Sequence, residues 1–176
     1  MRTVFSTLFQ SRYFPAYLLS ALVVLASCKG DDGGDNPTPN DLTAQQERAR
    51  DLVGTWASNN DNITAPTDTE DAAQQELQAL TMTFAVNNNT DLAPGSFSSE
   101  GADTYFSDGS GATWAWTSND STNVSDVTLN AVSPVAAFSI SNFDGSTMTI
   151  RFDFEGASTG RFAGIGEYTI QMTKQQ

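Results

Sequence analysis

The residues able to do covalent or acid–base chemistry in this chain are few. It has one cysteine, Cys28, and no histidine among its 176 residues. Histidine, the most frequent general base, is therefore absent, and Cys28 is the only possible thiol nucleophile. A disulfide needs two thiols, and structural zinc sites draw on several Cys or His ligands. We expect no disulfide framework, no metal site and no cofactor, so Cys28 should serve another purpose.

Carboxylates remain as candidates for catalysis, as in the acid pair of a glycosidase. Asp153 and Glu155 would share the outward face of a strand, where such acids are typical of solvated charge. The oxygen-rich segments 87–91, 108–111 and 119–120 lack the spaced acids of a known calcium loop. We expect turns at these places rather than metal sites. The sequence therefore predicts a protein that is not an enzyme.

The surroundings of Cys28 indicate its use. Arg2 and Arg12 lie in a leader without acids, and the apolar run Phe14–Ala26 has about thirteen residues against the roughly twenty of a membrane-spanning helix. Leu25-Ala26-Ser27-Cys28 resembles a bacterial lipobox. The resemblance implies a signal peptide over residues 1–27, cleavage before Cys28, and acyl chains on its sulfur and new amino group that bind a membrane. The alternative, a buried cysteine in an uncleaved anchor, fits the short run less well.

Residues 28–40 should be a lipidated cysteine followed by a flexible acidic tether. The segment holds Gly, Pro, Asn, Thr and charged residues, with nothing apolar to bury after Cys28. Its acids, Asp31, Asp32 and Asp35, resemble the export signal of surface lipoproteins in Bacteroidota. That resemblance implies a lipid-anchored protein of the outer membrane that faces the cell exterior. The simpler alternative is a solvated spacer.

The charge balance excludes one class of partner. Without Arg2 and Arg12 six cations face all 21 acids, so the formal net charge changes from −13 to −15. No Lys or Arg occurs between Asp51 and Ile150. Such a surface repels phosphate, which argues against nucleic-acid binding and against a basic patch for lipid headgroups. Net charge informs on solubility and association rather than on fold.

Residues 41–176 are enough for one domain with a core of its own. Two capping boxes, Thr43 to Gln46 and Thr67 to Glu70, predict short helices. The first helix should end near Asp51. The second should run through Leu80, for which the following strand competes.

The rest of the domain alternates like strands. In Thr147–Glu155 the apolar side chains fall on one face and the charged ones on the other, as in a half-buried antiparallel strand. Asp144-Gly145 signals a type I′ turn, so residues 137–141 should form a hairpin with it. Many short strands separated by turn residues predict an all-β barrel or sandwich. The other expected strands are Gly54–Ser58, Leu80–Val86, the surroundings of Phe97, Tyr105–Phe106, Thr113–Thr117, Val127–Leu129 and Gly166–Thr173.

Two segments resemble lipocalins. Leu52-Val53-Gly54-Thr55-Trp56 is similar to their Gly-x-Trp opening, and Gly166–Lys174 resembles the closing strand of small lipocalin-like lipoproteins of Bacteroidota. The resemblance implies an antiparallel up-and-down barrel of about eight strands, with one or two short helices near its start. Gly54 would let the backbone turn into the barrel and Trp56 would plug its closed end. The chain lacks the lipocalin helix after the barrel, and Arg161 or Lys174 would have to supply the cation over Trp56.

Trp114 and Trp116 are the candidate ligand-binding residues. Two indoles on one strand face provide either a platform for a sugar or the lining of an apolar pocket, and the alternative is packing in the core. We therefore expect a lipoprotein whose barrel binds a small apolar or saccharide ligand. The alternative is a non-catalytic accessory subunit, with a filled barrel, of an outer-membrane transport or secretion complex. The large inward side chains favour a filled interior.

Overall fold

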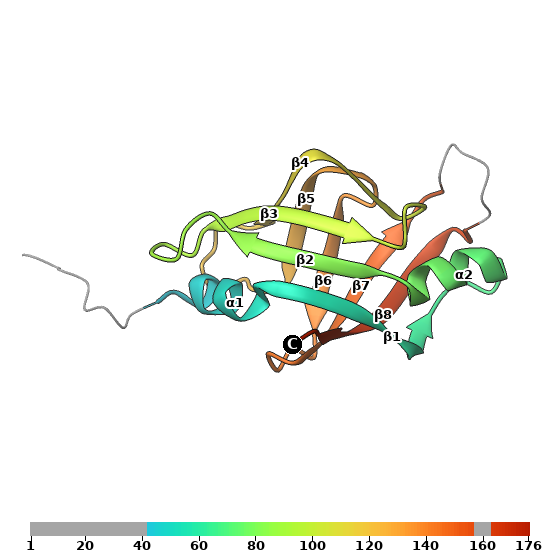
Figure 1. Cartoon of the computed structure of the whole chain (residues 1–176), viewed down its shortest axis with the longest axis horizontal. Coiled ribbons are helices and arrows are strands. Elements are labelled where there is room, and N and C mark those ends of the chain that lie inside the picture. Colours follow the sequence, from blue (N-terminus) through green and yellow to red (C-terminus); the bar gives the residue numbers. More distant parts are fainter. Residues whose placement is uncertain (1–41, 157–162) are drawn as a thin grey trace, which may run out of the picture. The chain divides into compact units, whose positions relative to one another are not determined.

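The computed structural model describes residues 42–156 and 163–176, which belong to one compact unit, residues 37–176. Eight antiparallel strands follow one another around a closed barrel, in which β1 also pairs with β8 (Figure 1). The predicted fold class is thereby confirmed. The expected leader, tether, Cys28 and Arg161 lie outside the described residues. The elements are α1 (Ala44–Leu52), β1 (Gly54–Thr64), α2 (Asp71–Gln78), β2 (Thr81–Val86), β3 (Pro94–Glu100), β4 (Phe106–Trp116), β5 (Asp126–Pro134), β6 (Ala137–Ser141), β7 (Thr147–Phe154) and β8 (Gly166–Lys174).

Large apolar side chains fill the interior of the barrel. Every strand and both helices contribute buried residues to a single core. Phe84 illustrates the packing, since its ring centroid lies 5.7 Å from that of Trp114 and 6.2 Å from that of Phe138. Phe152 stacks on Tyr168 at 5.2 Å. Each such side chain contributes about 1.5 to 3 kcal/mol by its burial, so the interior is the main source of stability.

Helix α1 covers one end of the barrel, away from α2 (Figure 1). The predicted capping box is confirmed, because the Thr43 hydroxyl accepts from the Gln46 N–H and the Gln46 side chain accepts from the Thr43 N–H. Gln45 fastens the helix to the β4–β5 loop. Its Nε2 lies 2.8 to 2.9 Å from three backbone carbonyl oxygens, those of Ser118, Asp120 and Asn123. Within the described residues, no helix is both long and apolar enough to cross a membrane.

The second predicted capping box is wrong. Helix α2 begins at Asp71 with Glu70 as its N-cap, and no side chain caps it. The preceding residues are already engaged, because the Thr69 N–H donates to Pro66 O and the Thr69 hydroxyl bonds to that of Tyr168. Leu80 belongs to neither competing element and lies fully buried between α2 and β2.

The two short strands predicted around residues 105 and 113–117 are one strand, β4. Its Asp-Gly-Ser-Gly segment does not form the expected loop but a bulge, since the register against β5 shifts between Asp108 and Thr113. Gly111, at φ +78°, adopts the left-handed conformation that glycine tolerates best. The long partner β5 keeps the segment extended on both sides of the bulge.

The β6–β7 hairpin is confirmed, but its connection is longer than a two-residue type I′ turn. It spans residues 142–146 between the two strands. The Asp144 carboxylate organises it by accepting from the Thr147 N–H at 2.6 Å and the Ser146 N–H at 2.8 Å. The Asp-Gly pair therefore marked the turn correctly and its type wrongly.

Candidate functional site

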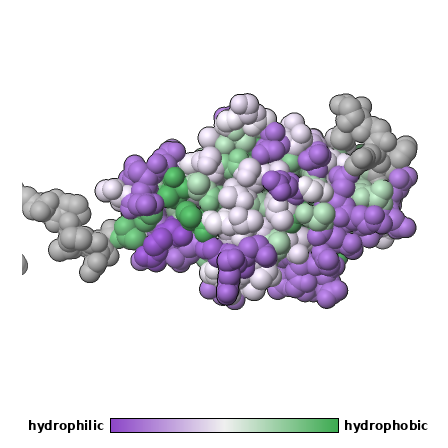
Figure 2. Space-filling model, viewed as in Figure 1, coloured by the Kyte–Doolittle hydropathy of each residue, from purple (hydrophilic) through white to green (hydrophobic). Residues whose placement is uncertain are grey.

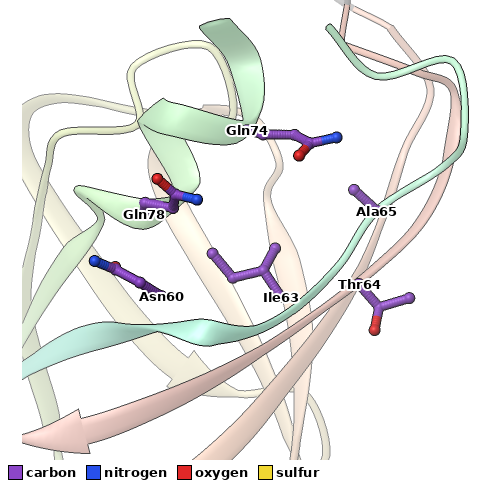
Figure 3. A pocket seen from close by; sticks show the side chains of 6 residues that line it. All are labelled: Asn60, Ile63, Thr64, Ala65, Gln74 and Gln78. Atoms are coloured by element: carbon purple, nitrogen blue, oxygen red, sulfur yellow. The ribbon is translucent and has the colours of Figure 1, made fainter. Parts of the chain in front are cut away.

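Strand β1 extends beyond the end of its neighbour β2, and this difference in strand length leaves room for a cleft. The paired positions of β1 with β2 run from Gly54 to Ala57, after which the Ser58 N–H donates to Leu80 O. The remainder of β1 lies beside α2, and a cleft of about 340 Å³ opens between the two elements (Figure 3). We call it the amide cleft; its lining residues are Asn60, Ile63, Thr64, Ala65, Gln74 and Gln78.

The lining of the amide cleft is polar without being charged. Gln74 and Gln78 extend from α2, while Asn60 and Ile63 rise from the opposite wall (Figure 3). Each side-chain amide offers two N–H donors and a carbonyl acceptor. Among the described residues, the side chains of Asn60 and Gln78 have no hydrogen-bond partner, and Gln74 Nε2 reaches only Thr69 O at 3.4 Å. These groups are available to a ligand.

Both walls of the amide cleft are held from behind. The register of β1 against β8 shifts between Ser58 and Ile63, and the Gln171 side chain bridges this bulge. Its Oε1 accepts from Asn62 Nδ2 at 2.7 Å and from Asn59 Nδ2 at 3.3 Å. On the other wall, α2 buries Leu77 and Ala73 in the core. The cleft therefore opens on the surface of a packed scaffold.

Comparison of the chain with models of protein families, with curated proteins and with solved structures finds no match. The functional interpretation therefore rests on the residues of the chain itself.

Gly54 and Trp56 lie at the start of β1, at the end of the barrel that α1 covers. Gly54 has φ +122°, and an added Cβ would come within 3.1 Å of Lys174 Cε. Trp56 is fully buried, and its Nε1 donates to Leu52 O at 2.8 Å. Lys174 Nζ lies 5.4 Å from the centroid of the Trp56 ring and donates to Asp51 O at 2.7 Å. Lys174 thus lies over the Trp56 ring, and Arg161 lies outside the described residues.

A second pocket, of about 390 Å³, lies beside α1 against the β6–β7 connection. The Arg48 guanidinium lies 4.1 Å from the centroid of the Phe143 ring, and Phe143 in turn contacts Trp56. Burial lowers the pKa of Arg48, and the nearby Asp51 carboxylate opposes this shift. Because its cation is engaged with an aromatic ring, we regard this pocket as part of the closed end. It is lined by Ala44, Glu47, Arg48, Asp51, Val124, Phe143 and Asp144.

The two candidate ligand-binding indoles point into the barrel. Trp114 is 2% exposed, and its Nε1 donates to Ala85 O at 2.7 Å. Trp116 is partly buried and meets Trp114 edge to face at 5.3 Å. Trp114 thus occupies the place that the core-packing alternative expects, and neither indole lines the amide cleft. A role for these two residues in ligand binding stays a prediction.

The acidic segments considered for metal or acid–base chemistry form local structure. The carboxylates of Asp91 and Asp120 accept backbone N–H groups of Ala93 and Thr122, which lowers the pKa of both acids. Asp153 lies opposite Glu167 on the outward face of β7 and β8. Across residues 42–156 and 163–176, no three His, Cys, Asp or Glu side chains gather in a way that could hold a metal ion.

Sequence reasoning missed the amide cleft. One wall, residues 60–65, lies beyond the predicted strand Gly54–Ser58, and the other comes from the predicted second helix, so nothing in the pattern brought them together. One signal was present in the sequence. A single strand contains Asn59, Asn60 and Asn62, although asparagine is depleted in strands. Amides in an unfavourable element indicate a local role other than strand formation.

Proposed function

We propose that the protein is a lipid-anchored outer-membrane lipoprotein, facing the cell exterior, that binds a small saccharide in the amide cleft. The barrel acts as a non-catalytic scaffold, and its interior is packed with its own side chains. The observation that carries the proposal is the contrast between that filled interior and an open cleft lined by uncharged amides. An apolar ligand would need an enclosed apolar cavity, so the saccharide is the better fit.

The chemistry of the cleft suits a sugar. Each sugar hydroxyl both donates and accepts a hydrogen bond, and a side-chain amide supplies the complementary acceptor and donor. Amides stand on both walls, with Gln74 and Gln78 on α2 and Asn60 on β1. Ile63 and Ala65 add an apolar surface for the C–H face of a pyranose ring. A small sugar would thus meet polar and apolar groups that match its own.

The anchor is supported by the sequence around Cys28. The lipobox-like residues end at Cys28, the only thiol. The acidic segment that follows it has few apolar residues and can act as a flexible spacer between the lipid anchor and the domain. One acyl chain binds a bilayer only marginally, whereas two or more anchor a protein stably. Radiolabelled palmitate should enter the protein, and Cys28→Ser should abolish both the label and membrane fractionation. Unchanged fractionation of this variant would contradict the anchor.

Saccharide binding is tested by isothermal titration calorimetry. The intact lipoprotein in detergent is titrated with neutral mono- and oligosaccharides. The double variant Asn60→Ala/Gln78→Ala should weaken binding of any sugar that binds by at least about tenfold, because two side-chain amides that would hydrogen-bond the sugar are lost. Gln75→Ala is the matched control, since Gln75 lies exposed on α2 outside the cleft lining. No binding by the unchanged protein, or equal binding by the double variant, would overturn the site.

A second function is favoured by the filled interior itself. A barrel without a ligand can serve as an accessory subunit of an outer-membrane transport or secretion complex, where its outer surface docks. Crosslinking in intact cells followed by mass spectrometry separates the two functions. A stoichiometric outer-membrane partner, with no retained sugar, would favour the accessory subunit; a retained sugar without such a partner would favour saccharide binding.

A further inference from the structure

The walls of the amide cleft carry acids on their flanks but no cation. Asp61 follows Asn60 on β1, and Asp71 opens α2; both are exposed. No Lys or Arg occurs between Asp51 and Ile150, a range that includes all of β1 and all of α2. Figure 2 shows hydrophilic residues gathered over α2. A ligand in the cleft therefore experiences a negative potential.

The cations that the structure describes are engaged elsewhere. Arg48 lies over Phe143, and Lys174 lies over Trp56, both at the end covered by α1. Arg50 pairs with Asp51 at 3.2 Å, and Arg151 pairs with Glu167. Within the described residues, none of these cations lines the amide cleft. Among the described residues, a carboxylate or sulfate on a sugar would thus find no cationic partner there.

We infer that the amide cleft selects saccharides by charge, accepting neutral sugars and amino sugars and rejecting uronic and sulfated sugars. This inference rests on the proposed saccharide site and adds its selectivity. An ammonium group on the sugar is attracted by the flanking carboxylates, and a carboxylate is repelled by them. Uncharged hydroxyls are bound by the amides alone. The selectivity comes from the field around the cleft, so salt should weaken it.

The test uses sugars of matched stereochemistry. Glucose, galactose and mannose are each compared with the corresponding uronic acid and 2-amino sugar in titrations of the intact lipoprotein. With two acids on the flanks of the cleft, we expect the amino sugar to bind about threefold to tenfold more tightly than the uronic acid at low salt. In about 0.5 M salt the ratio should fall below about twofold, because charges are screened within a few ångströms.

Charge-removing variants assign the effect to the cleft. Asp61→Asn/Asp71→Asn should lower the ratio at low salt while binding of the neutral sugar stays the same. Asp153→Asn is the control: it removes an exposed acid from β7, which does not border the cleft, and should leave the ratio largely intact. Equal binding of neutral and acidic sugars at low salt, or tighter binding of the acid, would overturn the inference while leaving the site intact. Failure of every sugar to bind would instead overturn the proposed function.

Discussion

The barrel interior and the amide cleft differ in how they hold polar groups, and in the interior only Trp116 Nε1, among the three indole N–H groups, has no hydrogen-bond partner. In the interior, the indole N–H groups of Trp56 and Trp114 donate to backbone carbonyls, and the Tyr168 hydroxyl donates to Gly164 O at 2.6 Å. In the cleft, Asn60 and Gln78 have no partner among the described residues. A buried polar group without a partner costs about 1 to 3 kcal/mol, whereas an exposed one is satisfied by water. Stability is thus concentrated in the interior, and the capacity to bind lies outside it.

This comparison explains how a small barrel can carry a binding site without an internal cavity. Filling the interior with aromatic side chains secures the fold. Strand β1, which extends past β2, then supplies one wall of the cleft. Helix α2, in the connection between β1 and β2, supplies the other wall. Changes in the interior should therefore alter stability first, and changes in the cleft should alter binding alone.

The largest effect should come from Trp114→Ala. The indole packs edge to face against Phe84 and Trp116 and is hydrogen-bonded to Ala85 O. Its removal should lower the free energy of unfolding by about 3 to 5 kcal/mol, measured by chemical denaturation. A loss below about 1 kcal/mol together with lost sugar binding would instead make Trp114 part of a binding platform.

A smaller effect is expected for Gln45→Ala, which removes the side-chain hydrogen bonds between α1 and the β4–β5 loop. The variant leaves three carbonyl oxygens without their shared donor. We expect a loss of about 1 to 3 kcal/mol in the free energy of unfolding. Gln75→Ala, an exposed helical glutamine on α2, serves as the control. If both variants unfold at the same denaturant concentration, the anchoring role of Gln45 is wrong.

Asp144→Asn should show a pH-dependent effect. Hydrogen bonds from the Thr147 and Ser146 N–H groups, and from their hydroxyls, hold the pKa of the Asp144 carboxyl far below its ordinary range. A depressed pKa stabilises the folded protein above the ordinary value of about 3.9, and this contribution is lost as the pH falls further. The melting temperature of the variant should thus lie below that of the unchanged protein at pH 7. The gap should narrow below about pH 4; a constant gap would contradict this account.

The smallest effect on stability should come from the cleft. Asn60→Ala/Gln78→Ala removes two exposed amides that support no other residue, so the free energy of unfolding should change by less than about 0.5 kcal/mol. The same variant should lose sugar binding. A loss of stability as large as that of Gln45→Ala would show that the amides support the fold, and would remove the contrast between the two regions.

Much of the barrel could be predicted from local patterns. Alternation placed β7 correctly, and the capping box at Thr43 placed α1, because both signals depend on residues close in the chain. The box at Thr67 failed because Thr69 bonds instead to Tyr168, a partner 99 residues away. The bulge in β4 was mistaken for a loop because its residues are held in the strand by pairing with β5 on both sides, which no local signal shows. Local signals failed where a distant partner decided the outcome.

The amide cleft could not be predicted in this way. It arises because β1 continues beyond β2 and α2 takes the vacant place, which is a property of strand lengths and register. The indoles attracted attention in the sequence because they are large and share a strand face, yet that face is the inner one. Small amides on two separate elements gave no comparable signal.

The central claim is that a ligand binds in the amide cleft and not inside the barrel. Nuclear magnetic resonance of the lipoprotein in detergent micelles, during titration with a neutral sugar that binds, tests it directly. The account predicts shifts in the side-chain amide signals of Asn60, Gln74 and Gln78. The methyl signals of the buried Met82, Met148 and Met172 should stay unchanged. Shifted methionine methyls with unchanged amide signals would place the ligand in the interior and contradict the claim.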